Sequence, residues 1–193
     1  EGKEIIRALV KDADIFIESS KGPVWARKGI TDDFLWEVNP RLVIVHVSGF
    51  GHVGDPKRVH SAAYDLTVQD YSGYVYQNGT PEEAMTAAPY TGDYFNSLMV
   101  ISSALAAVFR AQRTGEGESI DVAMYETMLR VGAYYMIDYM NKGVLYPRAG
   151  ARHQNLCAIG QYKTKDGILG LCCYGVPQNK YLLEVIGLGD LWG

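Results

Sequence analysis

The chain has 193 residues, of which 48% are hydrophobic and 21% are charged, and its 18 basic and 22 acidic side chains give a formal charge of −4. This composition is typical of a globular protein that buries its own core, and it lacks the clustered basic face of a nucleic-acid-binding protein. We find no apolar run of the length that a membrane span requires and no signal peptide, so we expect neither nucleic acid nor a membrane as a partner.

Helix and strand patterns alternate in the first part of the chain. The spacing predicts a helix over 3–12, a strand over 14–18, a loop over 19–23, a helix from Thr31 to Val38 and a strand over 42–47. The second strand is a nearly unbroken apolar run, which is typical of a parallel strand that is buried on both faces. We therefore predict an α/β layer.

A glycine-rich loop, residues 48–54, follows this strand. Its glycines do not have the GxGxxG spacing of a dinucleotide site, and the polar stretch after it contains Pro56, so no helix is expected to start on the glycines. A tight turn or a close backbone approach explains them.

The middle of the chain is predicted to be mostly helical. The expected elements are a helix over 62–71 closed by Gly73, a turn over 78–81, a long helix over 93–113 ending at Gly115, a strand over 119–122 and a helix over 124–141.

The pattern changes after Pro147. Residues 158–162 and 168–174 flank a turn and predict a β-hairpin, and a helix is expected over 177–186. We therefore place a domain boundary near 147–151, with one domain over 1–148 and the beginning of a second over 149–193. The chain starts with Glu1 and stops directly after an apolar Leu-Trp pair, so we expect both ends to be cut from a longer chain.

The cysteines and histidines predict no metal site. Cys157, Cys172 and Cys173 show neither CxxC nor Cys/His spacing, and neighbouring cysteines on a strand point to opposite faces. We expect reduced thiols in a cytosolic protein.

Asp93 begins the long apolar helix and allows two interpretations. As an N-cap, its carboxylate would accept hydrogen bonds from free amides of the first turn, which contributes about 1 kcal/mol. The helix dipole would also keep the carboxylate ionised, and an ionised carboxylate is a competent nucleophile toward an activated acyl group. Both interpretations stay open on spacing alone.

A small basic cluster surrounds Gly22-Pro23 and consists of Lys21, Arg27 and Lys28. It is either a solvated surface or an anion site for phosphates, with Lys as a point charge and Arg as a bidentate donor.

Several segments, in this order and spacing, resemble the class III CoA-transferases. They are residues 13–18, 42–51, 63–65, 72–73, the helix from Asp93, 113–117, 120–122 and Glu126. Three further motifs, 20–23, 27–31 and 89–95, are similar to the carnitine (γ-butyrobetaine) CoA-transferases.

This resemblance implies an interlocked homodimer of a large Rossmann-like domain and a smaller α+β domain. The chain would supply the central part of the first domain and the start of the second. Asp93 would be the catalytic carboxylate, and Lys21 and Lys28 would contact CoA, although close relatives often have Arg at the second position.

The resemblance also implies the substrates. They would be an acyl-CoA and a small betaine-type carboxylic acid (carnitine, γ-butyrobetaine or crotonobetaine), with coenzyme A as a substrate and no covalently bound cofactor. Asp93 would attack the thioester and form an acyl anhydride, and amides near Asp93 or at 49–51 would bind the oxyanion. The protein would be cytoplasmic.

Two other functions are alternatives for this sequence. An α-methylacyl-CoA racemase of the same superfamily needs a His-Asp pair where this chain has Tyr64-Asp65, and tyrosine with a pKa of about 10 is a poor base. The chain could also be a non-catalytic fragment that acts as an interaction module.

Overall fold

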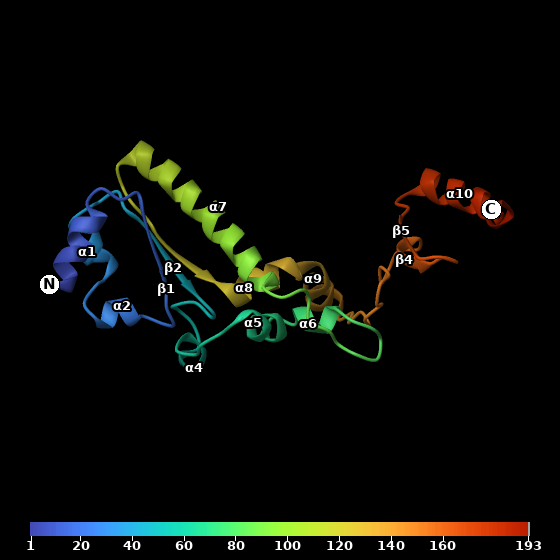
Figure 1. Cartoon of the computed structure of the whole chain (residues 1–193), viewed down its shortest axis with the longest axis horizontal. Coiled ribbons are helices and arrows are strands. Elements are labelled where there is room, and N and C mark those ends of the chain that lie inside the picture. Colours follow the sequence, from blue (N-terminus) through green and yellow to red (C-terminus); the bar gives the residue numbers. More distant parts are fainter. Residues whose placement is uncertain (193) are drawn as a thin grey trace.

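The computed structural model describes residues 1–192 and is an α/β fold built on a parallel sheet (Figure 1). The sheet contains β1 (Ile15–Ser19), β2 (Val43–Ser48) and β3 (Ser119–Ala123) in the order β1-β2-β3, and both pairings are parallel. The predicted buried strand is therefore confirmed as the central strand β2, and its residues Val43, Ile44 and Val45 are fully buried.

Helices cover both faces of this sheet. On one face, Ile44 packs with Val10 of α1 (Gly2–Val10) and with Leu35 of α3 (Asp32–Trp36). On the other face, Val43 and Val45 pack against alanines of the long helix α7 (Thr91–Thr114). Successive side chains of β2 point to opposite faces, so one apolar strand serves two helical layers.

Most predicted elements are present with slightly different ends. Thr31 caps α3 as expected, because its hydroxyl accepts a hydrogen bond from the Phe34 amide at 3.2 Å. The helix predicted over 62–71 begins later, as α5 (Asp65–Tyr71). Three single-turn helices were not predicted, because four residues are too few to show a period: α2 (Val24–Arg27), α4 (Pro56–Val59) and α6 (Tyr74–Gln77).

The single helix predicted over 124–141 is wrong. The structure has two helices, α8 (Met124–Val131) and α9 (Ala133–Lys142), which are separated at Gly132. A Cβ at position 132 would lie 2.8 Å from the Gln77 side-chain nitrogen, so a larger residue there would displace the Gln77 side chain of α6.

The C-terminal elements lie apart from the sheet in Figure 1. The predicted hairpin is confirmed as antiparallel β4 (Ile159–Lys163) and β5 (Ile168–Cys172), followed by α10 (Val176–Val185) and a 3₁₀ turn, η1 (Gly189–Leu191). The segment before the hairpin is held by Arg148, which donates to the carbonyls of Thr80 at 2.8 Å and Pro81 at 3.2 Å. The domain boundary near 147–151 stays a prediction.

Helix α7 corrects the sequence-based statement that no apolar run has the length of a membrane span. By length and composition, Thr91–Thr114 is long and apolar enough to cross a membrane. One stripe of this helix packs on the sheet through Ala104, Ala107 and Ala111, whereas large apolar side chains on its other sides, Leu105 and Phe109 among them, are exposed. A helix that covers a sheet passes the same length and hydropathy test.

The alanine stripe gives the first prediction. Ala107→Leu adds three carbons where α7 contacts β2, so it should destabilise the fold by about 1–3 kcal/mol in a chemical denaturation experiment. Ala106→Leu makes the same change at the exposed neighbouring position and should alter the free energy of unfolding by less than about 0.5 kcal/mol. Equal effects of the two substitutions would contradict the packing described here.

Candidate functional site

A cavity of about 400 Å³ opens at the carboxyl ends of β1 and β2. Its lining includes Lys21 after β1, Ser48 and Gly49 after β2, and Tyr64 before α5. The carboxyl edge of a parallel sheet is where open α/β folds bind ligands, so this cavity is the first candidate for a substrate site.

Asp93 lies in the first turn of α7, but it is not the N-cap. The helix begins at Thr91 and its N-cap is Tyr90, a residue with a left-handed backbone at φ 65° and ψ 16°. The capping interpretation of Asp93 is therefore wrong, because its carboxylate stands inside the first turn and not before it. The side chain is exposed and, within residues 1–192, accepts no hydrogen bond.

Another carboxylate supplies the cap. Asp65, the first residue of α5, accepts a hydrogen bond from the Gly92 amide at 2.7 Å through one oxygen and from the Tyr90 amide at 2.8 Å through the other. Helix α7 is therefore capped by the side chain of a different helix.

This arrangement changes the acidity of Asp93. Partial burial, and then the nearby Asp65 carboxylate, raise the pKa of Asp93 above its usual value. The sequence predicted the opposite influence, from the helix dipole. The amides of Tyr90 and Gly92, which would have stabilised Asp93, already bind Asp65.

The two predicted CoA contacts lie in different surroundings. Lys21 is exposed and lines the cavity at the sheet edge. Lys28 ends α2, and its ammonium lies 6.0 Å from the centre of the Trp25 ring. Neither Lys28 nor Asp93 lines this cavity.

The glycine-rich loop offers fewer free amides than its sequence indicated. The Gly51 amide donates to the buried Ser48 hydroxyl at 2.9 Å, and the His52 amide donates to Asp121 at 2.6 Å. The Gly51 amide is therefore already occupied by Ser48.

A charged network beside this loop was missed by the sequence analysis. His46 on β2 contacts Glu18 on β1 through Nδ1 at 2.9 Å and Asp32 on α3 through Nε2 at 3.0 Å. The Glu18 side chain is buried and also accepts a hydrogen bond from Ser20. Parallel pairing places Glu18 beside His46, so the strand register was the signal that could have found the pair.

The acidity of His46 follows from these contacts. Its hydrogen bond to Asp32, and then its bond to Glu18, outweigh the opposing effect of burial and raise the pKa of His46 to about 9. Burial has the largest single effect and would raise the pKa of Asp32, but the hydrogen bonds to His46 and Ser119 and the nearby charge of His46 together outweigh it and lower that pKa. His46 is therefore an imidazolium that joins two carboxylates.

Glu18 and His46 also lie close to His52, in a group that could hold a metal ion. One ligand atom from each of Glu18, His46 and His52 could lie within 4.8 Å of the others. A histidine that binds a metal must be neutral and must offer a free nitrogen lone pair. Both nitrogens of His46 instead face carboxylates at hydrogen-bond distance, which fits an imidazolium better than a metal ligand.

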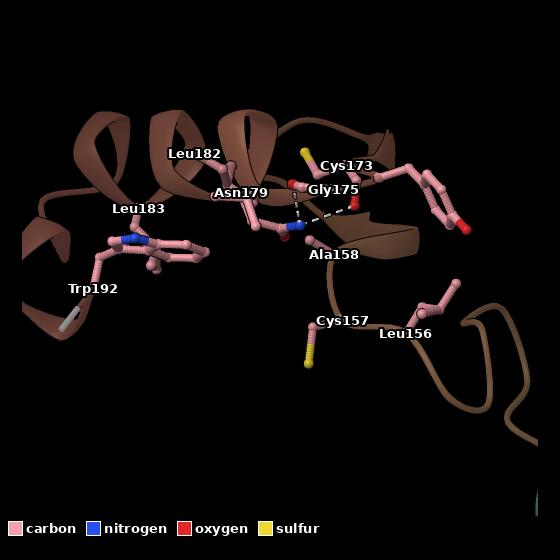
Figure 2. A pocket seen from close by; sticks show the side chains of 11 residues that line it. Leu156, Cys157, Ala158, Cys173, Gly175, Asn179, Leu182, Leu183 and Trp192 are labelled. Atoms are coloured by element: carbon pink, nitrogen blue, oxygen red, sulfur yellow. Dashed lines mark hydrogen bonds between the residues drawn. The ribbon is translucent and has the colours of Figure 1, made fainter.

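A larger cavity, about 660 Å³, lies between α10 and the segments that precede β4 and follow β5 (Figure 2). Its lining is mostly apolar and includes Leu156, Leu182 and Trp192, and Asn179 donates to the carbonyl of Gly175 at 2.8 Å. Among the described residues that line it there is no carboxylate, histidine or lysine, and its ionisable groups are the thiols of Cys157 and Cys173 and the phenol of Tyr174.

The chain is similar to known proteins in both sequence and fold. The family model described as CoA-transferase family III matches residues 1–193. Two curated proteins named L-carnitine CoA-transferase, from Proteus mirabilis (strain HI4320) and Proteus sp. (strain LE138), are each 47% identical to the chain. The matches cover 100% of this chain and 48% of each relative, so the chain spans about half the length of these relatives.

Solved structures share the fold. A CAIB/BAIF family protein from Brucella suis superposes with a TM-score of 0.81 at 29% identity, over 98% of this chain and 50% of that protein. A Mycobacterium tuberculosis protein superposes with a TM-score of 0.84 at 22% identity, over 98% of this chain and 49% of that protein. At that identity the second likeness shows the fold alone.

The charged network predicts how stability depends on pH. The pKa of His46 is about 9 in the folded chain against 6.5 unfolded, so its stabilisation is complete below about pH 6.5 and is lost as the pH rises through 9. With partial screening by solvent, His46→Gln should lower the free energy of unfolding by about 1–2 kcal/mol at pH 6 and by much less at pH 10. Urea denaturation of both proteins across this range measures the difference, and a constant difference would contradict the imidazolium assignment.

Proposed function

Because the chain belongs to CoA-transferase family III, we propose that the protein is a CoA-transferase that moves coenzyme A between carboxylic acids with Asp93 as the acyl carrier. The observation that carries this proposal is the Asp93 carboxylate, which is exposed in the first turn of α7 and does not cap this helix. Its raised pKa makes the carboxylate more basic than an ordinary aspartate, which favours nucleophilic attack once it is ionised.

The proposed reaction needs only carboxylates and a thioester. A carboxylate oxygen of Asp93 attacks the thioester carbon of the donor, the C–S bond breaks, and an acyl-aspartyl anhydride and CoA thiolate form. The thiolate attacks the aspartyl carbonyl, which releases the first acid and leaves an aspartyl thioester. The incoming carboxylate and the returning thiolate then repeat these steps in reverse order, so that the new acyl-CoA leaves and the Asp93 carboxylate is restored.

We propose that coenzyme A binds across the cavity at the sheet edge. Lys21 lines this cavity and supplies a positive charge for a phosphate group. The Lys28 ammonium lies against Trp25 outside the cavity, so its contact would be at the periphery of the nucleotide.

The proposed acceptor is a betaine-type acid: carnitine, γ-butyrobetaine or crotonobetaine. Two relatives at 47% identity are named L-carnitine CoA-transferase, and their similarity extends over the whole of this chain. All three acids carry the same trimethylammonium and carboxylate groups, so a site for one can admit the others.

We also propose that the full-length protein is a cytoplasmic homodimer. Each subunit would have the large Rossmann-like domain and the smaller domain that the resemblance to class III CoA-transferases implies. Large apolar side chains lie exposed on α7 and α10, among them Leu98, Phe109 and Val185, and exposed apolar surface is typical of association sites. The mass of the full-length protein in solution tests the assembly.

The racemase alternative gains no support from the site. Tyr64 stands where a racemase needs a histidine, and its side chain is exposed. The two oxygens of Asp65 accept three hydrogen bonds from Gln69, Tyr90 and Gly92, which leaves this carboxylate poorly placed to move a proton.

Replacement of Asp93 distinguishes a role as nucleophile from a role as helix cap. In the full-length protein, Asp93→Asn should lower kcat by roughly 10³-fold or more, because no acyl anhydride can form. It should change the free energy of unfolding by less than about 0.5 kcal/mol, whereas loss of a cap removes about 1 kcal/mol. Hydroxylamine with acyl-CoA should mark the peptide that contains Asp93, as read by mass spectrometry.

The matched control is Asp70→Asn, which removes an exposed carboxylate from α5 and should leave both turnover and trapping unchanged. An Asp93→Asn enzyme that is folded and still turns over would contradict the proposal.

Lys21→Ala should raise KM for acyl-CoA by roughly 10- to 100-fold and leave kcat within about twofold, because the lost phosphate contact acts on ground state and transition state alike. Steady-state kinetics of the full-length enzyme measure both constants. Lys57→Ala removes an exposed lysine of α4 and should change neither. Equal kinetics of the Lys21 variant and the wild type would rule out the proposed contact.

A further inference from the structure

We propose that Asp65 is a positioning residue of the Asp93 site: its carboxylate caps α7 from a neighbouring helix and leaves the Asp93 carboxylate free to face the acyl group. The inference rests on the proposed role of Asp93 as acyl carrier. Asp65 itself would not touch the substrate, because both of its oxygens are already engaged by the protein.

Asp65 and Gln69 act together on the segment before α7. They stand four residues apart on α5, and the Gln69 side chain, which is buried, donates to Asp65 at 2.9 Å. The carbonyl oxygen of that side chain accepts a hydrogen bond from the Ala87 amide at 3.0 Å. With the Tyr90 and Gly92 amides on Asp65, three backbone groups between residues 87 and 92 are fixed by one face of α5.

The contact also explains the residue that precedes Asp93. A Cβ at Gly92 would lie 2.9 Å from the Asp65 oxygen and 3.0 Å from a Val68 methyl group. A side chain at position 92 would therefore push the Asp65 carboxylate away from the amide that it now accepts at 2.7 Å. Glycine at this position favours the cap.

The backbone of Tyr90 shows that this segment is held. Tyr90 has φ 65°, a left-handed conformation that non-glycine residues adopt at an energetic cost. Such a conformation persists when surrounding contacts determine it, and the bond from its amide to Asp65 is one of them. The turn at Tyr90 sets the direction in which α7, and with it Asp93, begins.

Two consequences for Asp93 follow. Its carboxylate does not fold back onto the helix amides, because those of Tyr90 and Gly92 are taken. The negative charge of Asp65 also adds to the effect of partial burial in raising the pKa of Asp93. A less stabilised carboxylate is the more reactive nucleophile.

The test replaces Asp65 by Asn in the full-length protein. Asparagine has nearly the same size as aspartate, but it carries no charge. It also has one acceptor oxygen, whereas Asp65 uses two oxygens to accept its hydrogen bonds. The ¹³C titration midpoint of the Asp93 carboxyl should fall by about half a pH unit or more. The amides of Tyr90 and Gly92 should exchange with solvent at least about tenfold faster.

The kinetics should divide in a specific way. Asp65→Asn should lower kcat at least about tenfold with little change in KM for acyl-CoA, and the acidic limb of the pH profile should move to lower pH with the Asp93 titration. The control Thr127→Val removes the 3.0 Å bond from Thr127 to the buried Asn96, which joins α8 to α7 without any charge. It should lower thermal stability while leaving the Asp93 midpoint and the acidic limb in place.

The titration and exchange measurements do not depend on turnover. If acyl-CoA never labels Asp93 in the wild type, the proposed function fails, while an Asp93 midpoint that falls in Asp65→Asn still supports the cap. An unchanged midpoint together with unchanged exchange at Tyr90 and Gly92 overturns the role of Asp65, whatever the activity.

If Asp65→Asn does not fold, Gly92→Ala provides the second test. This variant retains the carboxylates of Asp65 and Asp93 and obstructs the hydrogen bond from the residue 92 amide to Asp65. Faster exchange at Tyr90 and Gly92 is then expected, and unchanged exchange overturns the proposal.

Discussion

The first turn of α7 is held by a carboxylate that another helix supplies, and the candidate site depends on this contact. Asp65 accepts the amides of Tyr90 and Gly92, so the helix begins in a fixed direction although its cap lies 25 residues away along the chain. The far end of the helix is fixed independently, because its alanine stripe packs on β2 and β3. Asp93 is thereby placed by a rigid helix and a rigid sheet, which is what a group that must meet a thioester requires.

A second charged contact lies near the carboxyl ends of β1 and β2. The His46 imidazolium joins Glu18 of β1 to Asp32 of α3, and the segment between these two residues contains Lys21 and α2. The segment that carries the proposed phosphate contact is therefore held at both ends by one histidine. The two networks are alike, because in each a side chain of one element forms hydrogen bonds at the start of another helix: Asp65 at α7 and His46 at α3. The exposed side chains nearby, Asp93 and Lys21, remain available for substrate.

Much of the fold could be predicted from sequence because the signals were local. The apolar run of β2, the Thr31 cap and the turn between β4 and β5 each specify their element within a few residues. The break at Gly132 was not predicted, and the residue that contacts it, Gln77, lies 55 positions away along the chain. The same holds for the candidate site. Asp93 could be recognised from the sequence because it stands at the start of a helix. The cap that Asp65 supplies and the pairing of Glu18 with His46 could not, because both are contacts between residues far apart in the sequence.

The account as a whole requires the thioester of a bound acyl-CoA to meet Asp93 while its nucleotide end occupies the cavity beside Lys21. A crystal structure of the full-length Asp93→Asn protein with an acyl-CoA tests this most directly, because the thioester should survive. The account predicts the thioester carbon within about 3–3.5 Å of the residue 93 side chain and a phosphate group beside Lys21. A thioester bound far from residue 93, with the α5–α7 contact intact, would contradict it.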